Sequence, residues 1–204
     1  MIAIIDYGVG NLFSLKSSFA AIGQEAAVTG DAAKIADAER VILPGVGAFA
    51  DAYEKLCTSG LDEAVRRAVK SGKPVMGICL GMQLLFERSF EYGEHPGLGL
   101  LGGEVVGMEG RLPSGLPIPH IGWNALKLRR PGGVLKYVKE GDCVYFVHSF
   151  YADNCPDSVT ATTEYGIDLT ASVQRDNLYG CQFHPEKSGK VGLGILRAFC
   201  ELEG

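Results

Sequence analysis

Cys79 has the sequence surroundings of a nucleophile. It stands between two glycines in the stretch GICLG, directly after an apolar run and before a helical pattern. A glycine-x-nucleophile-x-glycine pattern is typical of a sharp strand-to-helix turn that exposes the middle side chain. At a helix start, free N–H groups favour thiolate over thiol, and the N–H of Leu80 would stabilise an oxyanion. The turn alone fits two roles of Cys79 equally well, a nucleophile and a small hydrophobe that packs in the core.

A thiolate needs a base, and His184 is the histidine with a partner at a useful spacing. In the stretch QFHPEKS a proline follows His184, and Glu186 comes next. The proline restricts His184 to extended backbone, in which side chains two residues apart face the same way. Glu186 would then fix the tautomer of the imidazole and stabilise its charged form. By itself this pair fits a metal site or chance equally well, but together with the turn at Cys79 it indicates a catalytic triad. The other histidines, His95, His120 and His148, fit ordinary surface or core positions.

The elements that must position these residues alternate in type through the first half of the chain. Strands are expected at residues 2–6, 40–44 and 73–78, and helices at 11–23 and 61–72. Such alternation is typical of a parallel sheet with helices on both faces.

From about residue 103, short strands separated by turns replace this alternation. The expected strands are 104–108, 124–128, 144–152, 158–164, 169–173 and 178–183, with a closing helix at 189–202. Dense glycine and proline between residues 93 and 119 indicate a long loop. We therefore predict an α/β fold with a mostly parallel central sheet flanked by helices and an antiparallel extension, in one domain over residues 1–204.

Composition limits the kinds of partner. The net charge is −5, and the only adjacent basic pairs are Arg66-Arg67 and Arg129-Arg130, so we expect no nucleic-acid partner. The chain starts without a basic leader, and no apolar run approaches membrane-spanning length, so we expect a cytoplasmic protein with no membrane partner. The six cysteines show no C-x-x-C spacing, which predicts reduced thiols and no zinc site.

The stretch DYGVGN, residues 6–11, begins like a dinucleotide-binding fingerprint. Phe13 stands where the third glycine belongs, so we reject nucleotide binding there and expect no cofactor. A tight turn with Asn11 near the start of a helix fits this stretch at least as well as a functional role.

Taken together, GICLGMQ and HPEKS resemble the class I, or triad, glutamine amidotransferases. Further stretches, in the family's order over nearly the whole chain, resemble its branch of imidazole glycerol phosphate synthase glutaminase subunits: DYGVGN, LPGVGAF, PHIGWN, YFVHSFYA, TTEYG and QFHPEKS. In that branch L-glutamine is hydrolysed and the ammonia passes to a (β/α)8-barrel cyclase subunit. The cyclase makes imidazole glycerol phosphate and an aminoimidazole carboxamide ribonucleotide in histidine biosynthesis. The resemblance implies the same substrate and a heterodimer with such a cyclase.

The resemblance also implies roles for individual residues. Cys79 would form a glutamyl thioester, while His184, held by Glu186, would protonate the departing ammonia and then activate water. A second oxyanion element opposite Leu80 would come from a loop able to change conformation, Gly45, Val46 and Gly47. The implied substrate contacts are Gln83, Ser149 and Phe150.

Four further positions match residues that in the family lie near the cyclase or carry its signal. These are Asn11, Trp123, Tyr145 and Lys187. Without the resemblance, Trp123 and Tyr145 fit core positions equally well, and Lys187 fits a solvated charge.

Two other functions stay open. One is another class I amidotransferase, serving anthranilate or pyridoxal phosphate synthesis, although the pyridoxal branch resembles LPGGES where this chain has LPGVGA. The other is a cysteine hydrolase or a catalytically silent binding module on the same fold. A silent module does not need His184 and Glu186 at this spacing, and a peptidase does not call for PGVG. Glutamate release from glutamine, with and without a cyclase barrel, separates these alternatives.

Overall fold

The computed structural model describes residues 1–203 and is built around a nine-stranded mixed sheet. Across the sheet the strands are β2 (Ala26–Thr29), β1 (Ile2–Ile5), β3 (Arg40–Leu43), β4 (Val75–Ile78), β13 (Leu178–Cys181), β12 (Asp168–Arg175), β11 (Val159–Glu164), β8 (His120–Leu128) and β9 (Cys143–His148). Strands β2 to β13 in this order are parallel, and the rest continue the sheet in antiparallel pairs. The expected parallel sheet with an antiparallel extension is confirmed.

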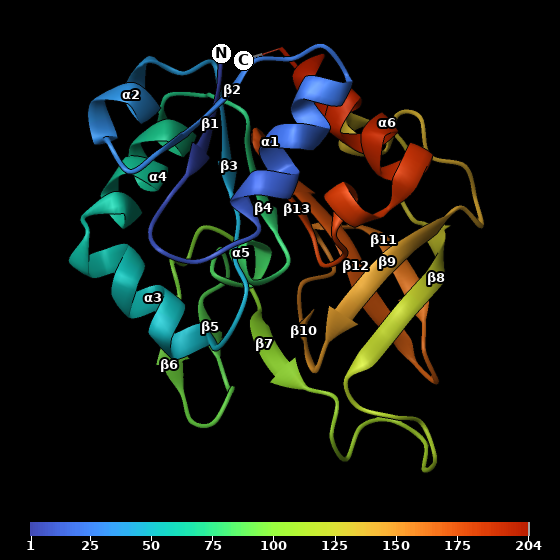
Figure 1. Ribbon diagram of the computed structural model, residues 1–204. Helices are drawn as coiled ribbons and strands as arrows, with labels where there is room; N and C mark the ends of the chain where they lie inside the picture. Colours follow the sequence, from blue (N-terminus) through green and yellow to red (C-terminus); the bar gives the residue numbers. More distant parts are fainter. Residues whose placement is uncertain (204) are drawn as a thin grey trace.

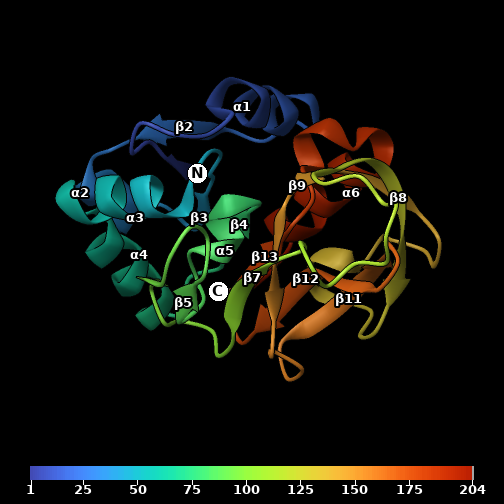
Figure 2. The same ribbon diagram turned by 90° about the horizontal axis from the view of Figure 1, so that it is seen from below.

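Helices cover both faces of the parallel part (Figures 1 and 2). One face carries α1 (Leu12–Ala21) and α6 (Gly189–Cys200), and the other carries α2 (Ala32–Asp37), α3 (Phe49–Thr58) and α4 (Leu61–Lys70). In β1, Ile2 and Ile4 pack toward the first pair of helices, while Ala3 and Ile5 pack toward the other three. Because successive side chains of a strand point to opposite faces, a strand covered on both sides must be apolar throughout.

Residues 144–152, expected to form one strand, form parts of two strands in different sheets. β9 ends at His148, and β10 (Phe150–Asp153) pairs with β7 (Glu104–Gly107) in a second sheet of order β10-β7-β5-β6. The remaining strands of that sheet are β5 (Arg88–Ser89) and β6 (His95–Pro96). The chain therefore changes sheets at Ser149. Apolar periodicity continues through this residue, so the sequence pattern does not show the change.

Strand β13 was expected in the antiparallel part, and this is correct only for its pairing with β12. It lies beside β4 in parallel register, with Ile78 opposite Cys181. The segments that lead to Cys79 and to His184 therefore end side by side at one edge of the sheet. The elements that the sequence pattern did not predict are β2, α2, α3, β5, β6 and the short 3-10 helices η1 (Gly133–Leu135) and η2 (Pro185–Lys187). The span 93–119, expected as a long loop, also contains β6 and β7.

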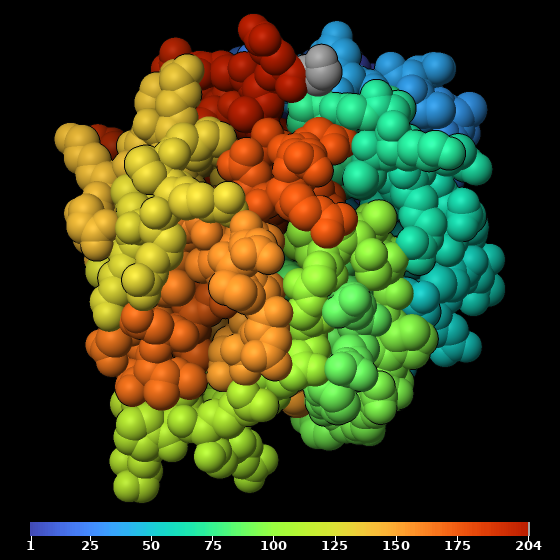
Figure 3. Space-filling view, turned by 180° about the vertical axis from the view of Figure 1, so that it is seen from behind, coloured from blue at the N-terminus to red at the C-terminus, as the bar shows by residue number. Residues whose placement is uncertain are grey.

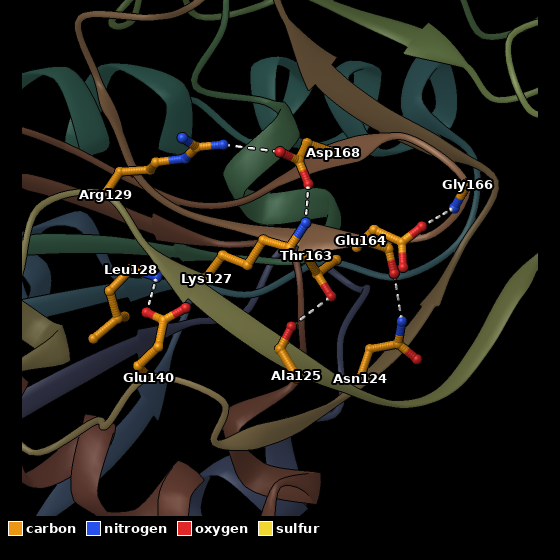
Figure 4. A network of polar contacts seen from close by, with 10 residues as sticks. All are labelled: Asn124, Ala125, Lys127, Leu128, Arg129, Glu140, Thr163, Glu164, Gly166 and Asp168. Carbon is orange, nitrogen blue, oxygen red and sulfur yellow. Dashed lines mark hydrogen bonds and ion pairs between the residues drawn. The ribbon is translucent and has the colours of Figure 1, made fainter.

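Polar side chains tie β8 to the hairpin of β11 and β12 (Figure 4). Asp168 accepts hydrogen bonds from Lys127 Nζ and Arg129 Nη2, each at 2.8 Å. Asn124 Nδ2 donates to the carbonyl oxygen of Glu164 at 2.9 Å. The ion pairs are half exposed, so each contributes at most about 1 kcal/mol to the free energy of unfolding. Their main effect is to hold the position of β8 against its neighbours.

The first and second halves of the chain occupy different sides of the surface. In the view from behind, the first hundred residues, blue to green, fill most of the right side, and yellow-to-red residues fill the left (Figure 3). Arg40 joins the halves, because its Nη2 donates to the carbonyl oxygen of Leu202 at 2.6 Å. No helix within residues 1–203 is long and apolar enough to cross a membrane.

Candidate active site

The sharp turn expected at Cys79 is present. Cys79 lies between β4 and α5 (Leu80–Gln83) with φ 54° and ψ −115°, a backbone conformation that is uncommon outside glycine. Close backbone contacts explain why the residues on both sides of the turn are glycines. A Cβ on Gly77 would lie 2.6 Å from the carbonyl oxygen of Gly81, and a Cβ on Gly81 would collide with the carbonyl oxygen of Leu43. The turn therefore requires glycine on both sides of Cys79.

The pairing of β13 with β4 brings His184 to Cys79. The N–H of Cys79 donates to the carbonyl oxygen of Cys181 at 2.8 Å, and His184 follows three residues later. His184 lines the same cavity as Cys79, and its Nδ1 lies 2.8 Å from Glu186 Oε1. The side chains of His184 and Glu186 are only 3% and 1% exposed. The fold thus assembles the three residues that the sequence pattern connected.

The segment after His184 is only partly extended. His184 has φ −100° and ψ 99°, as the proline predicts, but Pro185–Lys187 forms a 3-10 turn, η2. The hydroxyl of Ser188 donates to the carbonyl oxygen of His184 at 2.6 Å and accepts from the N–H of Tyr145 at 3.0 Å. Glu186 therefore reaches the imidazole through a braced turn, and not along an extended strand.

The charge state of His184 follows from its surroundings. Burial by itself lowers the pKa of the imidazole, but the hydrogen bonds and negative charges of Cys79 and Glu186 outweigh it and raise the pKa of His184 from 6.5 to about 9. At neutral pH the imidazole is therefore charged and sits between two groups that favour its proton. Such an arrangement suits a thiolate–imidazolium pair.

A cavity of about 340 Å³ lies beside these residues. Of the residues expected to bind or react with substrate, those lining it are Val46, Gly47, Cys79, Leu80, Gln83, Ser149, Phe150 and His184. Gly45 lies directly behind, since a Cβ there would be 2.6 Å from the N–H nitrogen of Gly81. The structure thus gathers the predicted oxyanion and substrate residues around the thiol.

The stretch DYGVGN braces the loop that contains Gly45. The hydroxyl of Tyr7 donates to the carbonyl oxygen of Pro44 at 2.7 Å, and a Cβ on Gly10 would lie 3.0 Å from the Pro44 Cβ. Tyr7 is buried, and this burial raises the pKa of its hydroxyl. Asn11 occupies the N-cap position of α1, as the turn interpretation predicts, but its side chain makes no capping hydrogen bond.

Several residues around the cavity carry no local sequence signal and were not predicted as site residues. Glu91 lines the cavity and accepts a hydrogen bond from the N–H of Phe49 at 2.8 Å. Burial raises the pKa of its carboxyl, and the bond from Phe49 partly offsets this. Tyr92 and His148 also line the cavity, and Gln182 Nε2 lies 3.7 Å from Cys79 Sγ. They come from three separate segments, so only the fold brings them together.

Three of the four predicted interface residues form one group next to η2. Trp123 on β8 is paired with Tyr145 on β9, and their ring centroids lie 6.0 Å apart. Lys187 Nζ lies 5.6 Å from the centroid of the Tyr145 ring. Trp123 is 54% exposed, so the alternative that it is a core residue is wrong. The fourth residue, Asn11, begins α1, which contacts η2.

Comparison with known proteins identifies close relatives over the whole chain. The family model for class-I glutamine amidotransferases matches residues 3–201. The imidazole glycerol phosphate synthase subunit HisH of Caldanaerobacter subterraneus subsp. tengcongensis is 51% identical, over 99% of this chain and 98% of the relative. The protein of the same name from Moorella thermoacetica is 50% identical, over 98% of this chain and 94% of the relative.

Solved structures with lower sequence identity share the fold. A crystal structure of a glutamine amidotransferase superposes with a TM-score of 0.76 and 20% identity, over 98% of both chains. The structure of PurLQS from Thermotoga maritima gives a TM-score of 0.75 and 20% identity, over 98% of this chain and 96% of that chain.

Proposed function

The chain belongs to the class I glutamine amidotransferases, and from this premise we propose that residues 1–204 act as one glutaminase domain in which Cys79 attacks L-glutamine. Within the family, the chain is the glutaminase subunit of imidazole glycerol phosphate synthase in histidine biosynthesis. The observation that carries the proposed mechanism is the cavity that contains Cys79 and His184, with Glu186 bonded to the imidazole behind it.

The first half of the reaction makes a thioester. The thiolate of Cys79 attacks the side-chain carboxamide carbon of glutamine, and the C=O electrons move onto oxygen. The N–H of Leu80 and a backbone N–H from Gly45, Val46 or Gly47 would stabilise this oxyanion. When the intermediate collapses, the C–N bond breaks and His184 gives its proton to the leaving nitrogen, which departs as ammonia.

The second half of the reaction releases glutamate. His184, now neutral, takes a proton from water, and the hydroxide attacks the thioester carbon. The C–S bond breaks, Cys79 leaves as thiolate, and His184 is charged again. The sum is glutamine plus water giving glutamate plus ammonia. Glu186 takes no proton in either step, because its role is to orient the imidazole and stabilise its charge.

The cavity also suits the amino-acid end of the substrate. Glu91 contributes a carboxylate, which attracts the α-ammonium group of glutamine. Gln83 Nε2 donates to the carbonyl oxygen of Phe150 at 3.0 Å and to Gln182 Oε1 at 2.9 Å, so Gln83 Oε1 remains as an acceptor for the same group. The backbone of Ser149 and Phe150, where the chain changes sheets, would bind the α-carboxylate.

A partner subunit follows from the assigned enzyme, and its surface on this chain is a proposal. We propose that the partner is a cyclase subunit with a (β/α)8 barrel, which receives the ammonia. We assign its contact surface to the group formed by Trp123, Tyr145 and Lys187, together with the start of α1 at Asn11. In this region the apolar side chains of Phe13 and Ile121 are 83% and 59% exposed. Apolar groups this exposed favour a partner that covers them. We also propose that the heterodimer acts in the cytoplasm.

One experiment tests this function against the alternatives. Glutamate release from L-glutamine would be measured for the chain alone and with the cyclase subunit, together with formation of imidazole glycerol phosphate. The proposal predicts glutamate and imidazole glycerol phosphate in equal amounts in the two-subunit enzyme. Glutamate release without ammonia transfer to this cyclase would favour an amidotransferase of another pathway. The absence of glutamate release would favour a hydrolase of another class or a silent module.

A further inference from the structure

We propose that Gln182 is a further catalytic residue, which donates an N–H to the sulfur of Cys79 and favours its thiolate. The proposal rests on the proposed role of Cys79 as the nucleophile. Gln182 directly follows β13, two residues before His184, and is fully buried. Its Nε2 lies 3.7 Å from Cys79 Sγ, a distance suitable for an N–H···S hydrogen bond.

The orientation of the Gln182 amide follows from one backbone carbonyl. The carbonyl oxygen of Phe150 can only accept, so Gln83 must turn its NH₂ group toward it. The other hydrogen of that nitrogen points to Gln182 Oε1 at 2.9 Å. Because the oxygen of Gln182 is engaged there, its NH₂ group faces the sulfur. A flipped amide at either glutamine would bring two acceptors or two donors together.

The same carbonyl is held by a second donor. His148 Nδ1 lies 2.8 Å from the carbonyl oxygen of Phe150, so Nδ1 carries the proton and Nε2 accepts from His120 Nδ1 at 3.1 Å. Burial, the largest influence, lowers the pKa of His148 to about 3, so its ring is neutral and its tautomer is fixed at neutral pH. His120 and His148 are therefore positioning residues at the far end of a row of hydrogen bonds that ends at Cys79.

A donor at the sulfur matters because the thiolate, and not the thiol, is the reactive form. A hydrogen bond to a charged acceptor is stronger than one to a neutral acceptor, so an N–H at this position stabilises the thiolate more than the thiol. His184 stabilises the same thiolate by its charge, and this contribution is lost when the imidazole loses its proton. The Gln182 amide is neutral and does not titrate, so its contribution persists at every pH.

The test is the pH dependence of Cys79 alkylation by iodoacetamide in the full-length chain, followed by mass spectrometry of the Cys79 peptide. Gln182→Met keeps the length of the side chain and removes the N–H donor. We expect the pH of half-maximal alkylation rate to rise by about one unit, and the rate at pH values well below the wild-type midpoint to fall roughly tenfold. The plateau rate at high pH should not fall, because a more basic thiolate is a better nucleophile.

Gln174→Met on the neighbouring strand β12 is the matched control, since it makes the same chemical change away from the thiol and should leave the profile unchanged. Thermal unfolding checks that each variant is folded, and Gln182→Leu replaces Gln182→Met if the latter is not. A folded variant with the wild-type midpoint would overturn the proposal. So would a lower plateau at an unchanged midpoint, which would mean that Gln182 only shapes access to the sulfur.

This experiment needs neither glutamine nor a cyclase, so its outcome is independent of the proposed function. If the wild-type chain released no glutamate but Gln182→Met still raised the midpoint, the proposed function would fail and the donor assignment would stand. If glutamate release were normal and the midpoint did not move, only the assignment of Gln182 would fail.

Discussion

His184 and Glu186 form a buried pair in which Nδ1 lies 2.8 Å from Oε1. Among residues 1–203, the second carboxylate oxygen, Oε2, has no hydrogen-bond donor. The contact places a proton on Nδ1 of the imidazole and leaves Nε2 for exchange with the thiol and the substrate. This geometry supports the two roles proposed for the pair, a base that transfers protons and a carboxylate that sets its tautomer and charge.

The first prediction concerns these two roles. His184→Ala removes the group that transfers protons, whereas Glu186→Gln leaves it in place with weaker support. We expect glutamate release by the two-subunit enzyme to fall by roughly 10³-fold or more for His184→Ala and by a smaller factor for Glu186→Gln. Circular dichroism would confirm that both variants are folded. The opposite order of losses would show that the roles are assigned wrongly.

The second prediction concerns alkaline pH. The folded-state pKa of His184 is raised from 6.5 to about 9, so the charged imidazole persists until the pH passes through that value. Its contribution to the free energy of unfolding is fully present below pH 6.5 and is lost as the pH rises through about 9. We expect kcat for glutamine hydrolysis to fall over the same range, and Glu186→Gln to move this fall to lower pH. A pH–kcat profile in which the two enzymes lose activity at the same pH would contradict the assignment.

The third prediction concerns acid stability. The pKa of His148 is about 3 in the folded chain, whereas the ordinary pKa of a histidine is 6.5. Between pH 6.5 and pH 3, the imidazole is therefore protonated in the unfolded chain but not in the folded chain. The free energy of unfolding should therefore fall by about 1.4 kcal/mol per pH unit from this group. His148→Asn retains a donor near the Phe150 carbonyl and lacks the titrating ring, so its stability should fall less steeply. Urea unfolding at several pH values in this window gives the slopes, and equal slopes would exclude His148 as the source.

The fourth prediction concerns the cyclase. The loop containing Gly45 and Gly47 holds Val46 at the rim of the cavity, 42% exposed, and Gly47 has φ 95°. We expect the loop to rest with a carbonyl toward the thiol and to present an N–H when the cyclase and its nucleotide ligand bind. One missing oxyanion donor typically costs roughly 10²–10³-fold in rate. Glutaminase assays on the chain alone, with cyclase, and with cyclase plus nucleotide should show a rise of that order. Equal turnover in all three would exclude the switch.

The proximity of the three residues of the proposed triad was predictable because its parts are local patterns. Gly77 and Gly81 are required by close backbone contacts around Cys79, so the chemistry of the turn is visible in the residues themselves. The spacing of His184 and Glu186 around a proline is equally local. The parallel sheet was predictable for a similar reason, because strands buried on both faces, such as β1, are continuously apolar.

What the sequence pattern missed depends on contacts between distant segments. A strand that leaves one sheet for another at Ser149 keeps its alternation, so no periodicity marks the change. The parallel pairing of β13 follows from its place beside β4, which composition does not encode. Glu91 reaches the cavity from a segment that contains no motif. Gln182 stands two residues before His184, but its contact with the sulfur depends on the pairing of β13 with β4. Trp123 resembles a core residue in its apolar strand and is nonetheless exposed.

The most direct test of the central claim is glutamate release by Cys79→Ser in the two-subunit enzyme. Serine occupies nearly the same volume as cysteine but does not provide a thiolate, so the turn should be retained while the nucleophile is lost. Thermal unfolding of the variant should match that of the wild-type chain. We predict no glutamate release above the background rate. Release within a few-fold of the wild-type rate by the folded variant would show that Cys79 is not the nucleophile.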